Sequence, residues 1–180
     1  MIHAKNAGRN GYKFFTEQMN NRITHKLMLE NALQDAYRDE VLLNHYQPIV
    51  HDFQKRIVGV ELLLRWPHEG TFISPGEFIP IAEEIGLIDA ITEQALHRAL
   101  RDLKPWFESS DDFYLSLNLS PIHILKSNLS DRLQDILALH HVSPSQLRLE
   151  ITENTLLEDK TKAAEQLNRL HSSGFKLFLD

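Results

Sequence analysis

Four oxygen-bearing side chains stand near the ends of segments that the sequence predicts to be β-strands. The C-terminal parts of the expected strands 57–65, 113–119, 146–152 and 175–180 contain Glu61, Asn118, Glu150 and Asp180, in that order. Because side chains alternate along a strand, each lies on the face opposite to a continuously apolar one. Any one of these residues, taken alone, is most simply explained as an isolated polar residue at a strand end, without a function. Four at matching positions predict a site for a hard divalent cation, and a set that contains no His or Cys disfavours zinc.

Two further polar residues accompany this set on the first strands. Arg65 shares a strand face with Glu61, and Gln47 lies in the preceding strand within Tyr46-Gln47-Pro48-Ile49. A carboxylate and a guanidinium on an otherwise apolar strand are costly to bury, and a structural ion pair is the simplest explanation for one such pair. The recurrence of carboxylates on later strands favours a functional role. Glu153, predicted to start a helix, and Glu83, predicted on a helix surface, are second-tier candidate acids.

The order of elements predicts an α/β fold. From residue 113 onward strands and helices alternate with short connections, which is typical of a parallel sheet, either doubly wound or part of a (β/α) barrel. The expected strands span 42–50, 57–65, 113–119, 146–152 and 175–180, with Trp66-Pro67 ending the second. The expected helices span 16–40, 74–86 with Ser74 as its cap, 88–105, 130–140 and 153–173.

Composition excludes several classes of protein. The 180 residues include 42% apolar and 24% charged residues, carry a net charge of −6 and contain no cysteine. The negative charge argues against binding to polymeric nucleic acid, and the lack of cysteine excludes disulfides and thiolate chemistry. No apolar run approaches a membrane span, so a cytoplasmic domain is expected, within a parent protein that upstream domains could anchor to a membrane.

Several ordered motifs resemble the EAL family of cyclic di-GMP phosphodiesterases. They are Tyr46-Gln47-Pro48-Ile49, Glu61-Leu62-Leu63-Leu64-Arg65-Trp66, the stretch from Ser74 to Glu83, Leu117-Asn118-Leu119-Ser120 and Leu149-Glu150-Ile151-Thr152-Glu153. The signature triplet here is Glu61-Leu62-Leu63, with leucine where alanine is usual. This change leaves the carboxylate intact.

The resemblance implies a (β/α)8 TIM-like barrel that hydrolyses cyclic di-GMP to linear pGpG with Mg²⁺ or Mn²⁺. By this resemblance, the family's metal-ligand positions correspond to Glu61, Asn118, Glu150 and Asp180 in this sequence. Glu61 is also the catalytic candidate. Gln47 matches a nucleotide-contacting glutamine, and Arg65 matches a phosphate-contacting arginine. Cyclic di-GMP is therefore the expected partner, and self-association into a homodimer is left open.

The resemblance extends over residues 41–180, the N-terminal part of such a domain. The family's second aspartate, a glycine-containing loop, a lysine, a glutamate and a glutamine would follow Asp180. An incomplete barrel with weak or no activity is therefore expected. An inactive module that binds cyclic di-GMP or a protein partner is the alternative, and a metal-dependent hydrolase of another phosphorylated substrate is a third, less favoured hypothesis.

The N-terminal segment suggests a neighbouring domain. Residues 1–15 resemble the closing element of a GGDEF (diguanylate cyclase) domain, through an Ala-Lys, Gly-Arg-Asn and Phe pattern. The signature loop of that family is absent, so no cyclase activity is carried over. Residues 16–40 are expected to form a helix that either links two modules or packs on its own domain.

Overall fold

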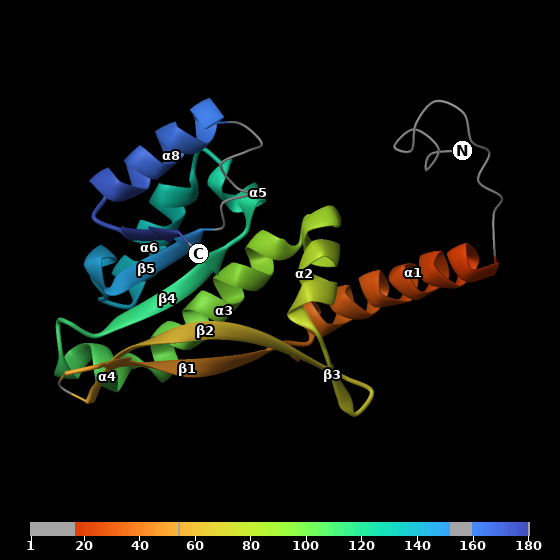
Figure 1. The fold of residues 1–180 in the computed structure, drawn as a ribbon, viewed down its shortest axis with the longest axis horizontal. Coiled ribbons are helices and arrows are strands. Elements are labelled where there is room, and N and C mark those ends of the chain that lie inside the picture. The colour runs from red at the N-terminus through yellow and green to blue at the C-terminus, as the bar shows by residue number, and fades with distance from the viewer. Residues whose placement is uncertain (1–16, 54, 152–159, 180) are drawn as a thin grey trace.

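The computed structural model describes residues 17–53, 55–151 and 160–179, which form a mixed sheet flanked by helices (Figure 1). The strands are β1 (Leu43–His51), β2 (Arg56–His68), β3 (Thr71–Ile73), β4 (Tyr114–Leu119), β5 (Leu147–Ile151) and β6 (Lys176–Leu179). The helices are α1 (Glu17–Arg38), α2 (Pro75–Glu84), α3 (Ile88–Asp102), α4 (Lys104–Ser109), α5 (Pro121–Ile124), α6 (Leu129–Leu139), α8 (Lys160–Ser172) and the short 3-10 helix η2 (Pro144–Gln146).

The sheet combines an antiparallel start with a parallel continuation. Its order is β1-β2-β4-β5-β6, and β3 pairs with the end of β2. β1 and β2 are antiparallel, whereas β2, β4, β5 and β6 are parallel to their neighbours. This alternation of parallel strands and helices confirms the predicted α/β class. It is consistent with an incomplete TIM-like barrel.

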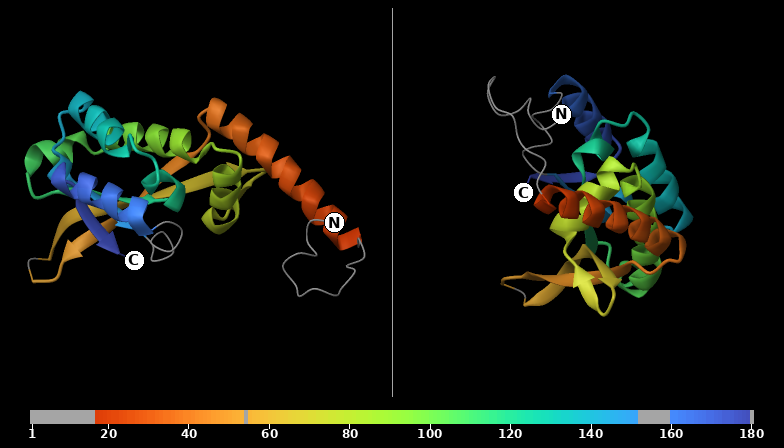
Figure 2. Two further views of the ribbon diagram at one scale, coloured as in Figure 1. Left: turned by 90° about the horizontal axis from the view of Figure 1, so that it is seen from above. Right: turned by 90° about the vertical axis from the view of Figure 1, so that its right-hand side faces the viewer.

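The larger hydrophobic core lies between one sheet face and the helices α3, α6 and α8 (Figures 1 and 2). Leu115, Leu147 and Leu149 are fully buried on this face. The alternation predicted from the sequence is therefore present, because the polar residues of the same strands point to the opposite face. Burial of this apolar face keeps the strands in register and so sets the positions of the polar side chains.

A second hydrophobic core attaches the C-terminal half of α1 to the rest of the domain. Leu29 and Leu33, in the C-terminal half of α1, are buried in a cluster with Trp66 and Phe78. The N-terminal part of α1 extends away from the sheet (Figure 2). The sequence left open whether this helix links two modules or packs on its own domain. Its C-terminal half packs on its own domain. Within the described ranges, none of the helices combines the length and the apolar character that a bilayer span requires.

The predicted end of the second strand was wrong. β2 does not end at Trp66-Pro67 but continues to His68, where it pairs with β3. Pro67 is tolerated because β1 has already ended opposite Arg65, so the missing N–H costs no hydrogen bond to that strand. Ser74 is the N-cap of α2, as predicted, although its side chain makes no capping hydrogen bond. Residues 1–15 and the first part of the helix predicted over 153–173 lie outside the described residues.

Gly59 is required where β2 meets β4. A Cβ atom at this position would lie 2.6 Å from the carbonyl oxygen of Tyr114 and 2.8 Å from its ring. We expect Gly59→Ala to lower the free energy of unfolding by about 1–3 kcal/mol, since the clash is partly with backbone. Urea denaturation checks this. Gly76→Ala is the matched control, because Gly76 is exposed in the first turn of α2 and a Cβ there would lie 3.7 Å from Ser74 Oγ; it should be neutral or slightly stabilising. Equal effects of the two changes would contradict the explanation.

Candidate active site

Glu61 and Asn118 meet where the parallel pairing of β2 with β4 ends. Asn118 Nδ2 donates a hydrogen bond to Glu61 Oε1 at 2.9 Å. This contact leaves the amide oxygen of Asn118 as an acceptor, and Asn118 is exposed. A carboxylate and an amide oxygen therefore lie side by side on the polar face of the sheet, where ligands of parallel α/β sheets normally bind.

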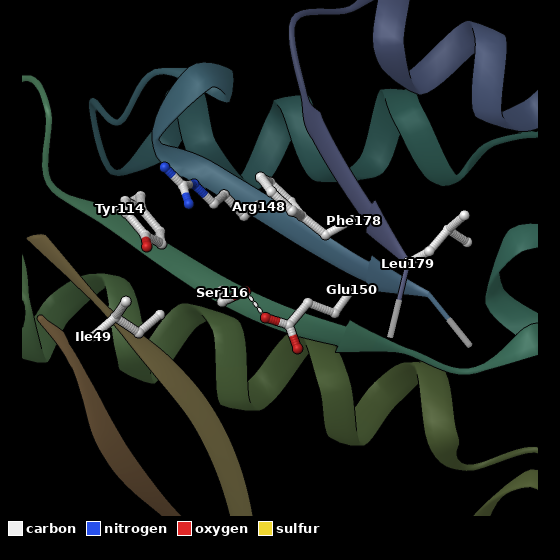
Figure 3. Close-up of a pocket in the computed structure, with 7 residues that line it drawn as sticks. All are labelled: Ile49, Tyr114, Ser116, Arg148, Glu150, Phe178 and Leu179. Atoms are coloured by element: carbon white, nitrogen blue, oxygen red, sulfur yellow. Dashed lines mark hydrogen bonds between the residues drawn. The ribbon is translucent and has the colours of Figure 1, made fainter. Parts of the chain in front are cut away.

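Glu150 extends this polar face to the next strand (Figure 3). Asn118 and Glu150 are directly paired in the register of β4 and β5. Ser116 Oγ donates a hydrogen bond to Glu150 Oε1 at 2.5 Å. β4 thus supplies one neutral donor to the carboxylate on each side of it, Asn118 to Glu61 and Ser116 to Glu150. Two strand spacings, about 10 Å, separate the backbones that carry the carboxylates, so both side chains can converge over β4.

Arg148 provides a positive charge on the same face. Its guanidinium carbon lies 3.2 Å from the centre of the Tyr114 ring and 5.0 Å from that of Phe178. Figure 3 shows the guanidinium between these rings, on the strand that also bears Glu150. A guanidinium held by aromatic faces is rigid and partly desolvated. It lowers the electrostatic cost of gathering carboxylates on this face.

Gln47 and Arg65 border the site from the side of β1 and β2. Gln47 is directly opposite Glu61 in the antiparallel register and is exposed. Its neighbour Tyr46 points the other way and donates to Asp102 Oδ2 at 2.6 Å, which orients β1. Arg65 is half-buried, and its Nη1 donates to the carbonyl oxygen of Leu64 at 2.9 Å.

A cavity of about 330 Å³ opens between Arg65 and Asn118. Its walls are mostly leucine, isoleucine and proline side chains, and Glu83, Ser120 and His123 add polar groups. Glu83 is not the plain surface residue that its helix predicted, because its Oε1 accepts a hydrogen bond from Ser120 Oγ at 2.5 Å. Glu84, by contrast, is exposed and pairs with Lys26.

The donor set suits a hard cation. The oxygens of Glu61, Asn118 and Glu150 are of the type that Mg²⁺ or Mn²⁺ prefers. Two of the predicted site residues, Asp180 and Glu153, lie outside the described residues. Among the side chains that the structure does describe, no three His, Cys, Asp or Glu residues are grouped to hold a metal ion. The ligand roles therefore stay predictions.

His123 is a buried histidine at the wall of the cavity. It is 4% exposed, and neither ring nitrogen has a hydrogen-bond partner among the described residues. Burial lowers its pKa from 6.5 to about 4, with Arg132 acting in the same direction and Glu83 and Glu93 opposing. Asp89 Oδ1 lies 3.0 Å from Nε2, but Asp89 is also paired with Lys126, which compensates its charge.

This depressed pKa predicts a dependence of stability on pH. The unfolded chain binds a proton at His123 near pH 6.5, whereas the folded chain does so only near pH 4, so stability falls as the pH drops through this window. We expect a loss of about 2 kcal/mol between pH 7.5 and pH 5 from this residue. Urea unfolding at both pH values measures it, and His123→Gln should remove that part of the pH dependence. If acidification stabilised the wild type relative to His123→Gln, the protonated imidazole would be favoured in the folded chain. The charge of Asp89 would then outweigh the effect of burial.

Sequence reasoning missed two polar residues of the site. Ser116 shares the face of Asn118, but a serine within a strand carries no distinctive signal until the register places it beside Glu150. His123 lies beyond the end of β4, in a short helix that the sequence analysis did not predict. Its only signal was a histidine among apolar residues, which most often indicates a core residue.

Comparison with known proteins decides the family. A model of the EAL domain matches residues 30–180. The chain belongs to the EAL family. Among curated relatives, the bifunctional diguanylate cyclase/cyclic di-GMP phosphodiesterase MucR of Pseudomonas aeruginosa is 37% identical over 100% of this chain and 27% of its own length. The probable cyclic di-GMP phosphodiesterase PdeB of Escherichia coli is 33% identical over 83% of this chain and 29% of its own length.

Solved structures agree with this assignment. The phosphodiesterase PaMucR in complex with c-di-GMP has a TM-score of 0.76 and 35% identity, over 83% of this chain and 62% of that one. The EAL enzyme Bd1971 with cAMP and cyclic di-GMP bound has a TM-score of 0.79 and 28% identity, over 88% of this chain and 45% of that one. This EAL chain spans between about a fifth and a third of the length of its curated relatives.

Proposed function

We propose that this chain is the N-terminal part of an EAL domain that hydrolyses cyclic di-GMP to linear pGpG with Mg²⁺ or Mn²⁺. The observation that carries the proposal is the placement of Glu61, Asn118 and Glu150 on one face of adjacent parallel strands, with Arg65 at the border. Relatives named as cyclic di-GMP phosphodiesterases, and neighbours solved with this nucleotide, support the substrate.

Each residue has a distinct role in this proposal. Glu61, Glu150 and the amide oxygen of Asn118 would hold a divalent cation, joined by Asp180. When bound, such a cation activates water and stabilises the charge that develops on the phosphodiester. Arg65 would hold a phosphate oxygen through its planar donors, in a geometry that lysine does not reproduce. Gln47 would contact the nucleotide, and Glu153 and Glu83 are assigned supporting roles.

A chromatographic assay of cyclic di-GMP tests the proposal. The protein should form linear dinucleotide in Mg²⁺ or Mn²⁺, and excess EDTA should abolish product because the carboxylates alone cannot activate water. The assay is run both on the 180-residue chain and on the parent protein. Turnover only by the parent would show that residues beyond this chain complete the site. Binding of the nucleotide without turnover by either would favour a cyclic di-GMP sensor, and hydrolysis of other phosphodiesters but not cyclic di-GMP would refute the proposed substrate.

We further propose that residues 1–15 close a GGDEF-like domain and that the helix over 16–40 connects it to the EAL domain of 41–180; self-association into a homodimer stays open. The alignment of the whole chain with a bifunctional cyclase/phosphodiesterase supports the first part. Coding sequence upstream of Met1 that lacks a GGDEF domain would contradict it. Sedimentation equilibrium measures the oligomeric state.

A further inference from the structure

The turn that follows β4 is held by two acidic residues from other helices. Ser120 Oγ donates to Glu83 of α2 at 2.5 Å. Further along, Lys126 forms an ion pair with Asp89 of α3, and His123 lies 3.0 Å from the same carboxylate without a hydrogen bond to it. Residues 120–126 are therefore tied to the two helices that follow β2, and not only to their own strand.

The contact between Glu83 and Ser120 is geometrically well defined. Ser120 is the N-cap of α5, and its Oγ accepts a hydrogen bond from the backbone N–H of Ile122 at 3.3 Å, so its proton is directed elsewhere. Glu83 follows Ile81 and Ala82, which are buried in the core beneath α2. Both partners are thus held by other interactions, and their hydrogen bond transmits the position of α2 to the turn.

Asn118 lies where the sheet itself gives little support on one side. The register between β2 and β4 ends at Leu62 and Leu117, one residue before Asn118. The register between β4 and β5 continues to Leu119. On the side of β2, Asn118 is therefore held by its hydrogen bond to Glu61 and, two residues later, by the bond from Ser120 to Glu83.

We propose that Glu83 and Ser120 are positioning residues, whose hydrogen bond sets the distance between Asn118 and Glu61. This inference rests on the proposed function, in which those two residues hold the cation. Arg65, Glu83, Asn118 and Ser120 line one cavity, so the bond lies beside the residues that it is proposed to position. Neither Glu83 nor Ser120 has to touch the substrate for this effect.

The test compares Glu83→Ala with Glu84→Ala in the full parent protein. Glu84 is the adjacent residue, forms an ion pair with Lys26 and serves as the matched control. We expect Glu83→Ala to raise the Mg²⁺ concentration that gives half-maximal activity by about 10- to 100-fold, as loss of a supporting contact does in other metal sites. The KM for cyclic di-GMP should change less. Ser120→Ala should act similarly, and Ser120→Thr, which keeps the hydroxyl, should restore wild-type behaviour.

A second measurement does not depend on turnover. Amide hydrogen exchange over residues 117–122 should be faster in Glu83→Ala than in the wild type and unchanged in Glu84→Ala. Unaltered exchange and unaltered Mg²⁺ dependence in Glu83→Ala would overturn the inference, even if the protein is an active phosphodiesterase. If the wild-type protein hydrolyses no cyclic di-GMP, the proposed function fails, and the exchange data alone decide whether Glu83 positions the turn.

Discussion

Glu61→Gln is expected to lower kcat for cyclic di-GMP hydrolysis by at least about 100-fold, the scale seen when one preorganised electrostatic contact to a transition state is lost. The substitution keeps the shape of the side chain and an oxygen that can accept from Asn118 Nδ2, which lies 2.9 Å from Oε1. It removes the negative charge that would hold the cation. The loss should therefore appear in turnover and in cation binding, and not in the fold.

The measurement is steady-state turnover in Mg²⁺, together with the thermal midpoint of each protein. Glu69→Gln is the matched control, because Glu69 is an exposed glutamate in the turn after β2. It should leave both values unchanged. Full activity of Glu61→Gln would exclude Glu61 as a cation ligand, whereas a large drop in the thermal midpoint would show that the carboxylate acts mainly on stability.

Trp66→Ala is expected to cause the largest loss of stability, about 3–5 kcal/mol, because it removes the largest side chain of the second core and leaves a cavity. Trp66 is 1% exposed, and its ring packs edge-to-face against Phe78 with centroids 5.8 Å apart. This core joins the C-terminal half of α1 to α2 and to the end of β2. Its loss should loosen α1 before the main sheet.

Urea denaturation followed by circular dichroism gives the change in the free energy of unfolding. Trp106→Ala is the matched control, since Trp106 is 46% exposed and stacks on Phe113 with centroids 5.4 Å apart. Its loss should cost below about 1.5 kcal/mol. Similar losses for the two tryptophans would mean that the second core contributes no more to stability than one exposed aromatic contact does.

The two faces of each strand could be predicted from the sequence. Alternation of apolar and polar residues in 113–119 and 146–152 placed Leu115 and Leu149 in the core and Asn118 and Glu150 opposite to them, as the structure has them. This succeeded because burial of an apolar face constrains every second residue, so the pattern is local in the sequence. The helix ends near Gly86 and Gly174, which have φ of +72° and +92°, were predictable for the same local reason.

Contacts between distant residues could not be predicted. Glutamates 83 and 84 are adjacent and identical in type, yet one reaches Ser120 and the other pairs with Lys26 on the surface. Pro67 continues a strand because β1 ends opposite Arg65, a fact that depends on another segment. Ser74 lacks the expected capping bond although its motif is complete. In each case the partner, or its absence, is set by how separate elements pack.

The sequence by itself determined the α/β class, the faces of the strands and the EAL motifs, because each depends on residue type and short-range spacing. Only the tertiary structure decided which side chains meet: Asn118 with Glu61, Ser116 with Glu150, and Ser120 with Glu83. The physical reason is the register between strands. It is set by the packing of the whole sheet against α3, α6 and α8, so no single segment of the sequence contains it.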